Sequence, residues 1–203
     1  MNQGDQPAAP PARGDWTTLE RQSLLALPPW LTVVREQVRV PSGRVIDDFY
    51  QVLMRDFVMI VPVDTDGRFV FVRGYKHGPR SMTLSPPGGL IEAAETPLAA
   101  GVRELREETG HAGGDWRPLG SYVVDANRHC GTMHLFLARD VRYEQAPMWD
   151  DTEPLEVVRL GRAEAVEALA DGQLGCLAAA AAVTIALALM DAPGRPSSAE
   201  TVR

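Results

Sequence analysis

Three glutamates, Glu104, Glu107 and Glu108, lie close together in the segment RELREETG. On an α-helix, side chains three and four positions apart are neighbours, so these carboxylates would share one face. Same-sign charges at this spacing destabilise a helix unless a cation lies among them. Carboxylate oxygens without a histidine or cysteine cluster suit a hard divalent cation, Mg²⁺ first and Mn²⁺ second. The alternative is a solvated acidic helix face that binds nothing.

The residues around this cluster follow a fixed spacing. In chain order they are Gly89, Glu95, Arg103, Glu104, Leu105, Glu107, Glu108 and Gly110. The pattern resembles the Nudix box, the signature of hydrolases that act on a nucleoside diphosphate linked to another group. So many fixed identities should occur by chance in well under roughly one chain in a hundred thousand. His111 departs from the pattern, because the family expects an apolar residue after the final glycine.

The resemblance implies a Mg²⁺-dependent pyrophosphatase, with Mn²⁺ as the other candidate ion. The metal ligands that it implies are Gly88 through its main-chain carbonyl, Glu104, Glu107, Glu108 and Glu153. Arg103 would orient the carboxylates, and Glu95 would brace the preceding loop against the helix. Glu107 could act as a ligand or as a partner of the ligands.

The general base is expected outside the box, in the acidic loop WDDTEP that precedes the last strand. The family pattern favours Glu153 as base or additional metal ligand, with Asp151 second. A solvated acidic turn is the alternative reading of this loop.

Substrate recognition is expected from two further segments. Arg73 and Tyr75 follow an apolar strand, at the point where related ADP-ribose and nucleotide-sugar enzymes line their substrate cleft. Arg128 or His129, in the loop DANRHCG, could meet a second phosphate or a sugar hydroxyl. The alternatives are a surface charge at the end of a strand for Arg73 and solvent-facing loop positions for the other two. Because this loop departs from the Ser-Pro-Gly type common in ADP-ribose pyrophosphatases, the attached group stays open.

The composition is that of an ordinary globular protein. The 203 residues are 23% charged and carry a net charge of −7, which argues against nucleic acid as the main partner. Cys130 and Cys176 stand far apart and are expected to be reduced thiols in a cytoplasmic protein. The N-terminus lacks a signal-peptide core, and the apolar run from 174 to 190 is expected to be a buried helix, so no membrane partner is predicted.

The elements that must position these residues predict an α/β fold. Strands are expected over 30–40, 45–54, 57–63, 69–72, 119–125, 132–139 and 155–160, and helices over 97–109, 162–170 and 176–190. Thr96 should cap the first helix, Pro97 should occupy its first position, and Gly110 should end it. Leu98, Val102 and Leu105 are expected to form its buried face. Together with the resemblance, this order predicts a Nudix α/β/α sandwich with a mixed sheet and an N-terminal β-hairpin extension.

The expected domain organisation has four parts. Residues 1–25 should be disordered or loosely ordered, 26–54 should form the hairpin, 55–192 the Nudix hydrolase domain, and 193–203 a flexible tail. The resemblance implies that the hairpin packs across a homodimer. Among the possible substrates, the resemblance favours ADP-ribose. The alternatives are another diphosphate, such as a dinucleoside polyphosphate, a nucleoside triphosphate or coenzyme A, and a Nudix module that senses a nucleotide without cutting it.

Overall fold

The structure is a computed structural model that describes residues 14–149 and 154–192. The strands are β1 (Thr17–Leu27), β2 (Leu31–Arg39), β3 (Val45–Met54), β4 (Phe57–Asp64), β5 (Phe69–Lys76), β6 (Ser81–Ser85), β7 (Gly88–Leu90), β8 (His111–Ala112), β9 (Asp115–Asp125), β10 (His129–Tyr143) and β11 (Glu156–Leu160). The helices are α1 (Pro97–Thr109), α2 (Arg162–Ala170) and α3 (Leu177–Leu189). The predicted α/β class with a mixed sheet is confirmed.

The chain divides into two compact units. The first contains Met1–Arg55 and Asp125–Gly131, and the second contains Asp56–Val124 and Thr132–Arg203. The division after Arg55 lies next to the expected start of the second domain at residue 55. The segment Asp125–Gly131 was not expected in the first unit; it belongs there because His129 pairs with Val52 of β3.

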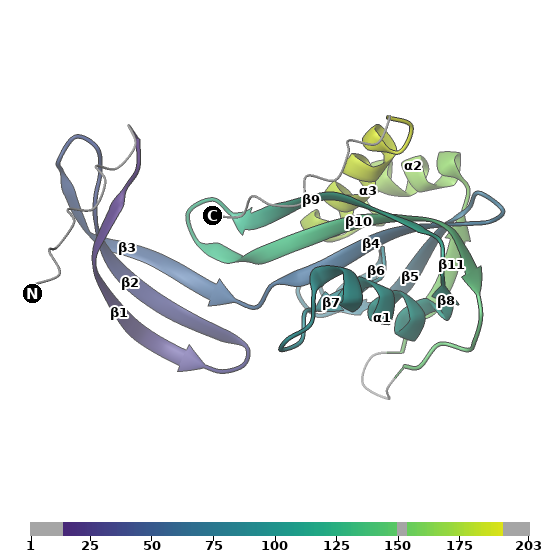
Figure 1. Ribbon diagram of the computed structural model, residues 1–203, viewed down its shortest axis with the longest axis horizontal. Helices are drawn as coiled ribbons and strands as arrows, with labels where there is room; N and C mark the ends of the chain where they lie inside the picture. Colours follow the sequence, from purple (N-terminus) through teal and green to yellow (C-terminus); the bar gives the residue numbers. More distant parts are fainter. Residues whose placement is uncertain (1–13, 150–153, 193–203) are drawn as a thin grey trace, which may run out of the picture. The chain divides into compact units, whose positions relative to one another are not determined.

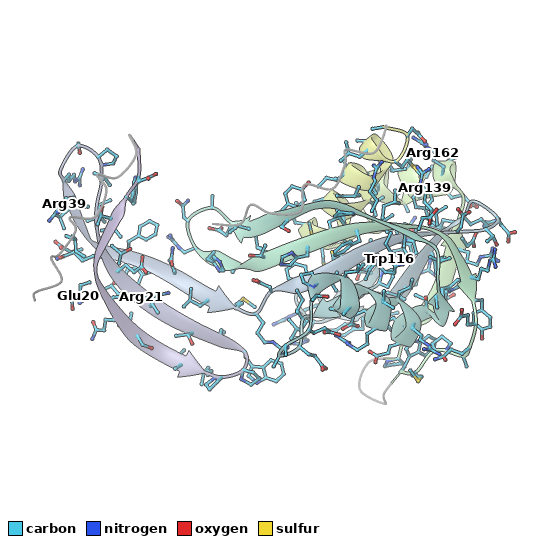
Figure 2. The ribbon with its side chains drawn as sticks, in the orientation of Figure 1. Glu20, Arg21, Arg39, Trp116, Arg139 and Arg162 are labelled. Carbon is cyan, nitrogen blue, oxygen red and sulfur yellow. The ribbon has the colours of Figure 1, made fainter. Side chains whose placement is uncertain are left out.

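The first unit is a small antiparallel sheet in the order β1-β2-β3. The expected hairpin corresponds to β2 and β3, whereas the expectation of a loosely ordered segment up to residue 25 is wrong from Thr17 onward, where β1 begins. β1 is exposed along its whole length, so its sequence carries little hydrophobic alternation that could have revealed it. Its backbone pairing with β2 holds it in place, with an ion pair between Arg21 and Glu36 at 3.3 Å. Figure 2 labels Arg21 on this strand.

The second unit is built on a mixed sheet in which β10, β4, β5 and β11 are neighbours. β10 runs parallel to β4, while β4 and β5, and β5 and β11, are antiparallel. β7 pairs with the other edge of β4, and β6 pairs with β5. As predicted for two central strands, β4 and the first four residues of β5 are buried on both faces, apart from half-buried Phe57.

Helices cover both faces of this sheet (Figure 1). Side chains of β4 alternate between the two faces, as the strand period of two requires. Val58 and Ile60 pack with α1, whereas Met59 and Val61 pack with α2 and α3. The unit therefore has the layered α/β/α arrangement that was expected.

Helix α1 has the predicted bounds, because its end signals are local. Thr96 Oγ1 accepts a hydrogen bond from Ala99 N at 3.2 Å, and Pro97 is the first helical residue. Gly110 ends the helix in the left-handed conformation, with φ of 71°, and its N–H donates to Arg106 O.

The buried face of α1 differs from the expectation. Leu105 is buried as predicted, but Leu98 and Val102 are 44% and 43% exposed. The helix instead turns small residues toward the sheet, and a Cβ built on Gly101 would lie 3.1 Å from the Trp116 ring. Figure 2 shows Trp116 on β9, beside the helix layer. Close packing of small residues beneath an indole therefore replaces the predicted leucine face.

Helix α3 covers the apolar run near the C-terminus. Only one face is buried, and Leu177 at its start is 84% exposed, so the expected buried helix is buried on one side only. Arginines bond to its C-terminal end: Arg139 donates to Met190 O, and Arg162 donates to Leu187 O at 3.4 Å and to the Asp191 side-chain carboxylate at 2.8 Å (Figure 2). Within 14–149 and 154–192, no helix has the length and apolar character needed to cross a membrane.

Candidate active site

Arg103, in the middle of α1, joins three carboxylates of the box, those of Glu95, Glu104 and Glu107, into one network. Its Nε and Nη2 donate to Glu95 at 3.0 and 3.1 Å, and its Nη1 donates to Glu104 at 2.7 Å and to Glu107 at 3.1 Å. Nη2 also donates to the main-chain oxygen of Leu90, at 3.1 Å. One planar guanidinium thus fixes the glycine strand, the loop and the helix together. These contacts are the ones that an orienting role of Arg103 and a bracing role of Glu95 would require, and both roles stay predictions.

The network perturbs the ionisation of its members in opposite directions. Burial raises the pKa of Glu104, and the charge of Arg103 offsets part of that rise. The hydrogen bonds from Arg103 lower the pKa of Glu95. The hydrogen bond with Glu95 raises the pKa of Arg103, so the guanidinium stays charged. Glu104 is therefore a carboxylate whose charge is only partly compensated by the protein.

The two glycines of β7 allow the strand to approach these carboxylates. Gly88 N donates to Glu108 Oε2 at 2.9 Å. A Cβ on Gly88 would lie 2.2 Å from the main-chain oxygen of Val58, and a Cβ on Gly89 would lie 2.2 Å from Glu104 Oε1. Both distances are far below van der Waals contact. At Gly88 the obstacle is main chain, so only glycine fits there, whereas a side chain at position 89 would have to displace the Glu104 carboxylate.

The donor set of this site fits a hard divalent cation. Glu104, Glu107 and Glu108 supply only oxygen atoms, which is the ligand type that Mg²⁺ and Mn²⁺ select. As the side chains lie, no group of three acidic, histidine or cysteine side chains in the described residues converges on one point. Arg103 bonds to both Glu104 and Glu107, and Glu108 accepts from Gly88. A bound cation would compete with Arg103 for Glu104, whose carboxylate is the most buried of the three contacts of Arg103.

The C-terminal end of α1 is held by a strap, residues 144–149, which the sequence did not reveal. Its main-chain N–H groups and one indole satisfy the last carbonyls of the helix. Met148 N donates to Glu107 O at 2.8 Å, and Trp149 Nε1 donates to Glu108 O at 2.8 Å. Glu144 N donates to Gly110 O at 2.9 Å. The main chain of two box glutamates is thereby anchored from outside the box, by contacts that no local motif encodes.

Arg73 and Tyr75 lie on β5, which also contacts α1. Arg73 is paired with Glu156 of β11 at 3.1 Å, and both side chains are partly exposed. Tyr75 is 51% exposed, and its hydroxyl lies 3.4 Å from His77 Nδ1. The ion pair between Arg73 and Glu156 was not expected. Glu156 lies directly opposite Arg73 in the register of β11 and β5, and the sequence alone does not give that register.

Arg128 lies in the other unit, in the short turn between β9 and β10. Asp125 Oδ1 accepts from Asn127 N at 2.8 Å and from Arg128 N at 2.5 Å, and these bonds lower the pKa of Asp125. Val52 N donates to Arg128 O at 2.8 Å. The main chain at Arg128 is thus fixed within the first unit. The structure does not bring Arg128 together with Arg73 and the box glutamates in one unit.

The two acidic residues expected to provide the base, Glu153 and Asp151, lie outside the described residues. The described chain enters that loop at Trp149 and leaves it at Pro154 and Leu155. The site that the structure describes therefore consists of Gly88, Arg103, Glu104, Glu107 and Glu108, with Arg73 and Tyr75 on the neighbouring strand β5.

Comparison with known families gives two matches in this chain. Residues 53–179 match the model of the NUDIX domain. Residues 16–52 match the model of the nucleoside diphosphate sugar hydrolase N-terminal domain. The boundary between the two matches falls next to the division between the two units at Arg55.

Comparison of the chain with individual proteins agrees with these family matches. The chain is 32% identical over 117 residues to the ADP compounds hydrolase NudE of Escherichia coli, covering 58% of this chain and 62% of that protein. It is 34% identical over 88 residues to an ADP-ribose pyrophosphatase of Mycobacterium tuberculosis, covering 42% of this chain and 41% of that protein. A crystal structure of an ADP compounds hydrolase has a TM-score of 0.71, covers 90% of this chain and 97% of that chain, and is 24% identical, which is a likeness of fold.

Proposed function

The chain belongs to the NUDIX family, and on this premise we propose that it is a Mg²⁺-dependent pyrophosphatase that cuts a nucleoside diphosphate linked to a sugar. The products would be a nucleoside monophosphate and a sugar phosphate, and ADP-ribose is the substrate that we favour. The observation that carries the proposal is the network of Arg103 with Glu95, Glu104 and Glu107, set against the glycines of β7.

Glu104, Glu107 and Glu108 would hold the metal, with the main-chain carbonyl of Gly88 and with Glu153. A divalent ion at such a site neutralises charge on the diphosphate oxygens and lowers the pKa of water. Mn²⁺ has the same ligand preference and should substitute.

The protein's own residues have separate tasks in this proposal. Arg103 holds the carboxylates in place and stays charged, so it does not exchange protons during turnover. Trp149 and Met148 fix the carbonyls of Glu108 and Glu107, which limits rotation of the end of the helix. Arg73, Tyr75 and Arg128 would bind the substrate. Glu153, with Asp151 as the alternative, would accept the proton from the attacking water.

The sugar-linked class of substrate is supported by the N-terminal match. Residues 16–52 match a domain described for nucleoside diphosphate sugar hydrolases. Two relatives are named for ADP compounds and ADP-ribose, respectively. This combination favours ADP-ribose over a nucleoside triphosphate or coenzyme A. We also infer a cytoplasmic homodimer in which the first unit contributes to the contact between subunits.

A substrate panel tests the proposal. Purified protein should release a nucleoside monophosphate from ADP-ribose, and to a lesser extent from ADP-glucose or GDP-mannose, when Mg²⁺ is present. Removal of the ion with EDTA should abolish release, and added Mg²⁺ or Mn²⁺ should restore it. Absence of turnover with all three compounds would disprove the proposed substrate class.

The variant Glu108→Gln separates catalysis from binding alone. We expect kcat/KM to fall roughly 100-fold or more, because a catalytic metal contributes several kcal/mol to transition-state stabilisation. Glu167→Gln, an exposed glutamate on α2, is the matched control and should retain activity. Equal activity of the two variants would refute the metal assignment.

A further inference from the structure

The last turn of α1 carries two of the box glutamates, and its main-chain oxygens need donors from outside the helix. An α-helix leaves the carbonyls of its last four residues without a partner inside the helix. In α1 these residues are Arg106, Glu107, Glu108 and Thr109. Glu104 lies one turn earlier, where a carbonyl is satisfied within the helix itself. Outside support therefore concerns Glu107 and Glu108 in particular.

Residues next to the helix satisfy the first and the last of these four carbonyls. Gly110 N donates to Arg106 O at 2.9 Å. His111 Nδ1 lies 3.0 Å from Thr109 O, and the ring donates there, because a carbonyl oxygen can only accept. Both donors follow directly from the local chain. The carbonyls of the two glutamates depend on a more distant segment.

That segment is the strap, residues 144–149. Met148 N donates to Glu107 O at 2.8 Å. Trp149 Nε1 donates to Glu108 O, also at 2.8 Å. The carboxylates of the same glutamates are held from elsewhere, since Glu107 accepts from Arg103 at 3.1 Å and Glu108 accepts from the main chain of β7 at 2.9 Å. Each glutamate is thus fixed at its side chain and at its main chain, and the strap supplies the main-chain contact.

The first residues of the strap are fixed against the final glycine of the box. Gly110 O accepts from Glu144 N at 2.9 Å and from Gln145 N at 3.3 Å. A Cβ on Gly110 would collide with the main-chain oxygen of Gln145. Arg106 Nε also donates to Gln145 Oε1, at 3.1 Å. The glycine therefore both ends the helix and admits the strap beside it.

The last residues of the strap are held by hydrogen bonds more than by burial. Trp149 is 41% exposed and Met148 is 59% exposed. A segment with few buried apolar contacts opens at a low free-energy cost. Its docked and undocked states are then close enough in free energy for an ion at the neighbouring carboxylates to shift the balance between them.

We propose that Trp149 is a positioning residue for the metal ligand Glu108, and that metal binding and docking of the strap favour each other. The indole acts through the main chain of Glu108 and is not a catalytic residue. Coupling between two equilibria is reciprocal, so a docked strap that raises the metal affinity is itself stabilised by the metal. The assignment of Glu108 as a ligand rests on the proposed function, whereas the coupling can be measured without a substrate.

Trp149→Phe tests the indole donor, because it removes one N–H and keeps an aromatic ring. Mn²⁺ is titrated into the full chain without substrate, and the EPR signal of the free ion gives the dissociation constant. We expect the affinity for Mn²⁺ to fall roughly three- to tenfold, the effect of one hydrogen bond. With ADP-ribose, kcat at saturating Mg²⁺ should stay at the wild-type value, because excess ion restores occupancy. A loss of kcat without a loss of Mn²⁺ affinity would overturn the positioning role.

Trp116→Phe is the matched control. Trp116 also donates its indole N–H to a main-chain oxygen, Gly113 O at 3.0 Å, and its ring lies against α1 at Gly101. This bond goes to the loop after β8 rather than to a box glutamate. The variant should keep the wild-type affinity for Mn²⁺ even where its stability falls. An equal loss of affinity in both tryptophan variants would reveal a general effect of aromatic packing and overturn the inference.

Amide hydrogen exchange of the wild type measures docking of the strap directly. The amide of Met148 donates to Glu107 O, so its exchange reports whether the strap is docked. Mg²⁺ should slow exchange over residues 144–149 roughly threefold or more and leave exchange over α2 unchanged. This measurement needs no variant, so it decides the question even if Trp149→Phe does not fold. Unchanged exchange over the strap would overturn the coupling.

The outcomes distinguish the role of Trp149 from the proposed function. If the wild type cleaves ADP-ribose and Trp149→Phe binds Mn²⁺ as tightly as the wild type, the positioning role fails and the proposed function stands. If no sugar-linked diphosphate is cleaved but the Mn²⁺ affinity falls as expected in Trp149→Phe, the proposed function fails and the positioning role stands. Absence of Mn²⁺ binding to the wild type would remove both.

Discussion

At the scale of single residues, the contacts of Arg103 go beyond what the box motif reveals. The box pattern identifies the residue, but its five hydrogen bonds to a strand, a loop and a helix appear only in the fold. Two of these go to Glu95 and one to the main chain of Leu90, so the arginine organises the site even before a cation enters.

Arg103→Lys should therefore damage the site although it preserves charge. A single ammonium cannot bridge Glu95, Glu104 and Glu107 with planar geometry. We expect kcat/KM to fall roughly 10- to 100-fold, as for other residues that orient metal ligands. Steady-state kinetics with ADP-ribose would measure this, with Arg106→Lys on the same helix as the control. A lysine variant with full activity would show that the network is dispensable.

Asp64 gives a prediction about pH. Burial alone would raise its pKa, but the hydrogen bonds from Arg68 N, Arg159 and Asp66 N outweigh it, and the pKa lies below the ordinary value of 3.8. The folded state then binds fewer protons than the unfolded state, so this group stabilises the protein above the unfolded pKa. That stabilisation is lost as the pH falls through the lower, folded pKa.

Asp64→Asn should consequently lower the free energy of unfolding at pH 7 by about 1 to 3 kcal/mol, the range for disrupted buried hydrogen bonds. The difference from the wild type should shrink toward zero as the pH falls below the unfolded pKa toward the folded one. Urea titrations between pH 7 and pH 3 measure both effects. A difference that does not depend on pH would argue against the ionised Asp64.

At the scale of elements, α1 shows which features could be predicted from the sequence. Its ends were predicted because Thr96, Pro97 and Gly110 act within one turn of the chain. Its buried face was not, because the helix meets Trp116, a residue of a strand that follows it. Leu98 and Val102 are apolar at helical spacing, yet they stay exposed, and α1 packs on β4 through Ala100, Gly101 and Leu105 instead.

The same distinction applies to the candidate site. The box residues could be read from local spacing. The strap over 144–149 follows the end of β10, and the partner of Arg73 depends on the pairing between β5 and β11, so neither could be read from local spacing. β1 was missed for a related reason, since a fully exposed strand has no alternation and is defined by its neighbour β2.

The close packing of β7 against α1 leads to a prediction about the position of Glu104. Gly89→Ala would place a Cβ 2.2 Å from Glu104 Oε1, and the carboxylate, at the end of a flexible side chain, should move aside. We expect a folded protein that needs a higher Mg²⁺ concentration for half-maximal activity. Gly78→Ala, where an added Cβ meets nothing within 4 Å, is the control. An unchanged Mg²⁺ requirement in Gly89→Ala would contradict the placement of Glu104 at the metal.

At the scale of the whole molecule, the first unit exposes an unusual amount of apolar surface. Trp30 is 68% exposed, and Leu24, Leu25 and Leu27 of β1 are 46% to 50% exposed. Exposed apolar residues gathered on one small sheet are typical of a surface that another protein covers. This supports the proposal that the first unit takes part in a homodimer.

Leu25→Glu tests that proposal. A charge placed within a subunit contact should shift the protein from twice the chain mass to the mass of one chain in light scattering coupled to size-exclusion chromatography. Leu177→Glu, at the 84% exposed leucine of α3, is the matched control and should leave the mass unchanged. A monomeric wild type, or a dimeric Leu25→Glu variant, would refute the role of β1.

The composition of the first unit also bears on how the chain is made. Val52 of β3 pairs with His129, and Val52 N donates to Arg128 O, so the first unit includes a segment that follows Asp56–Val124 of the second unit in sequence. A ribosome releases the chain from its N-terminus. The first unit therefore cannot complete its pairing until residues 125–131 have emerged, and by then the box helix is already outside. Synthesis order and structural order thus differ in this protein: the N-terminal sheet is begun first and finished late.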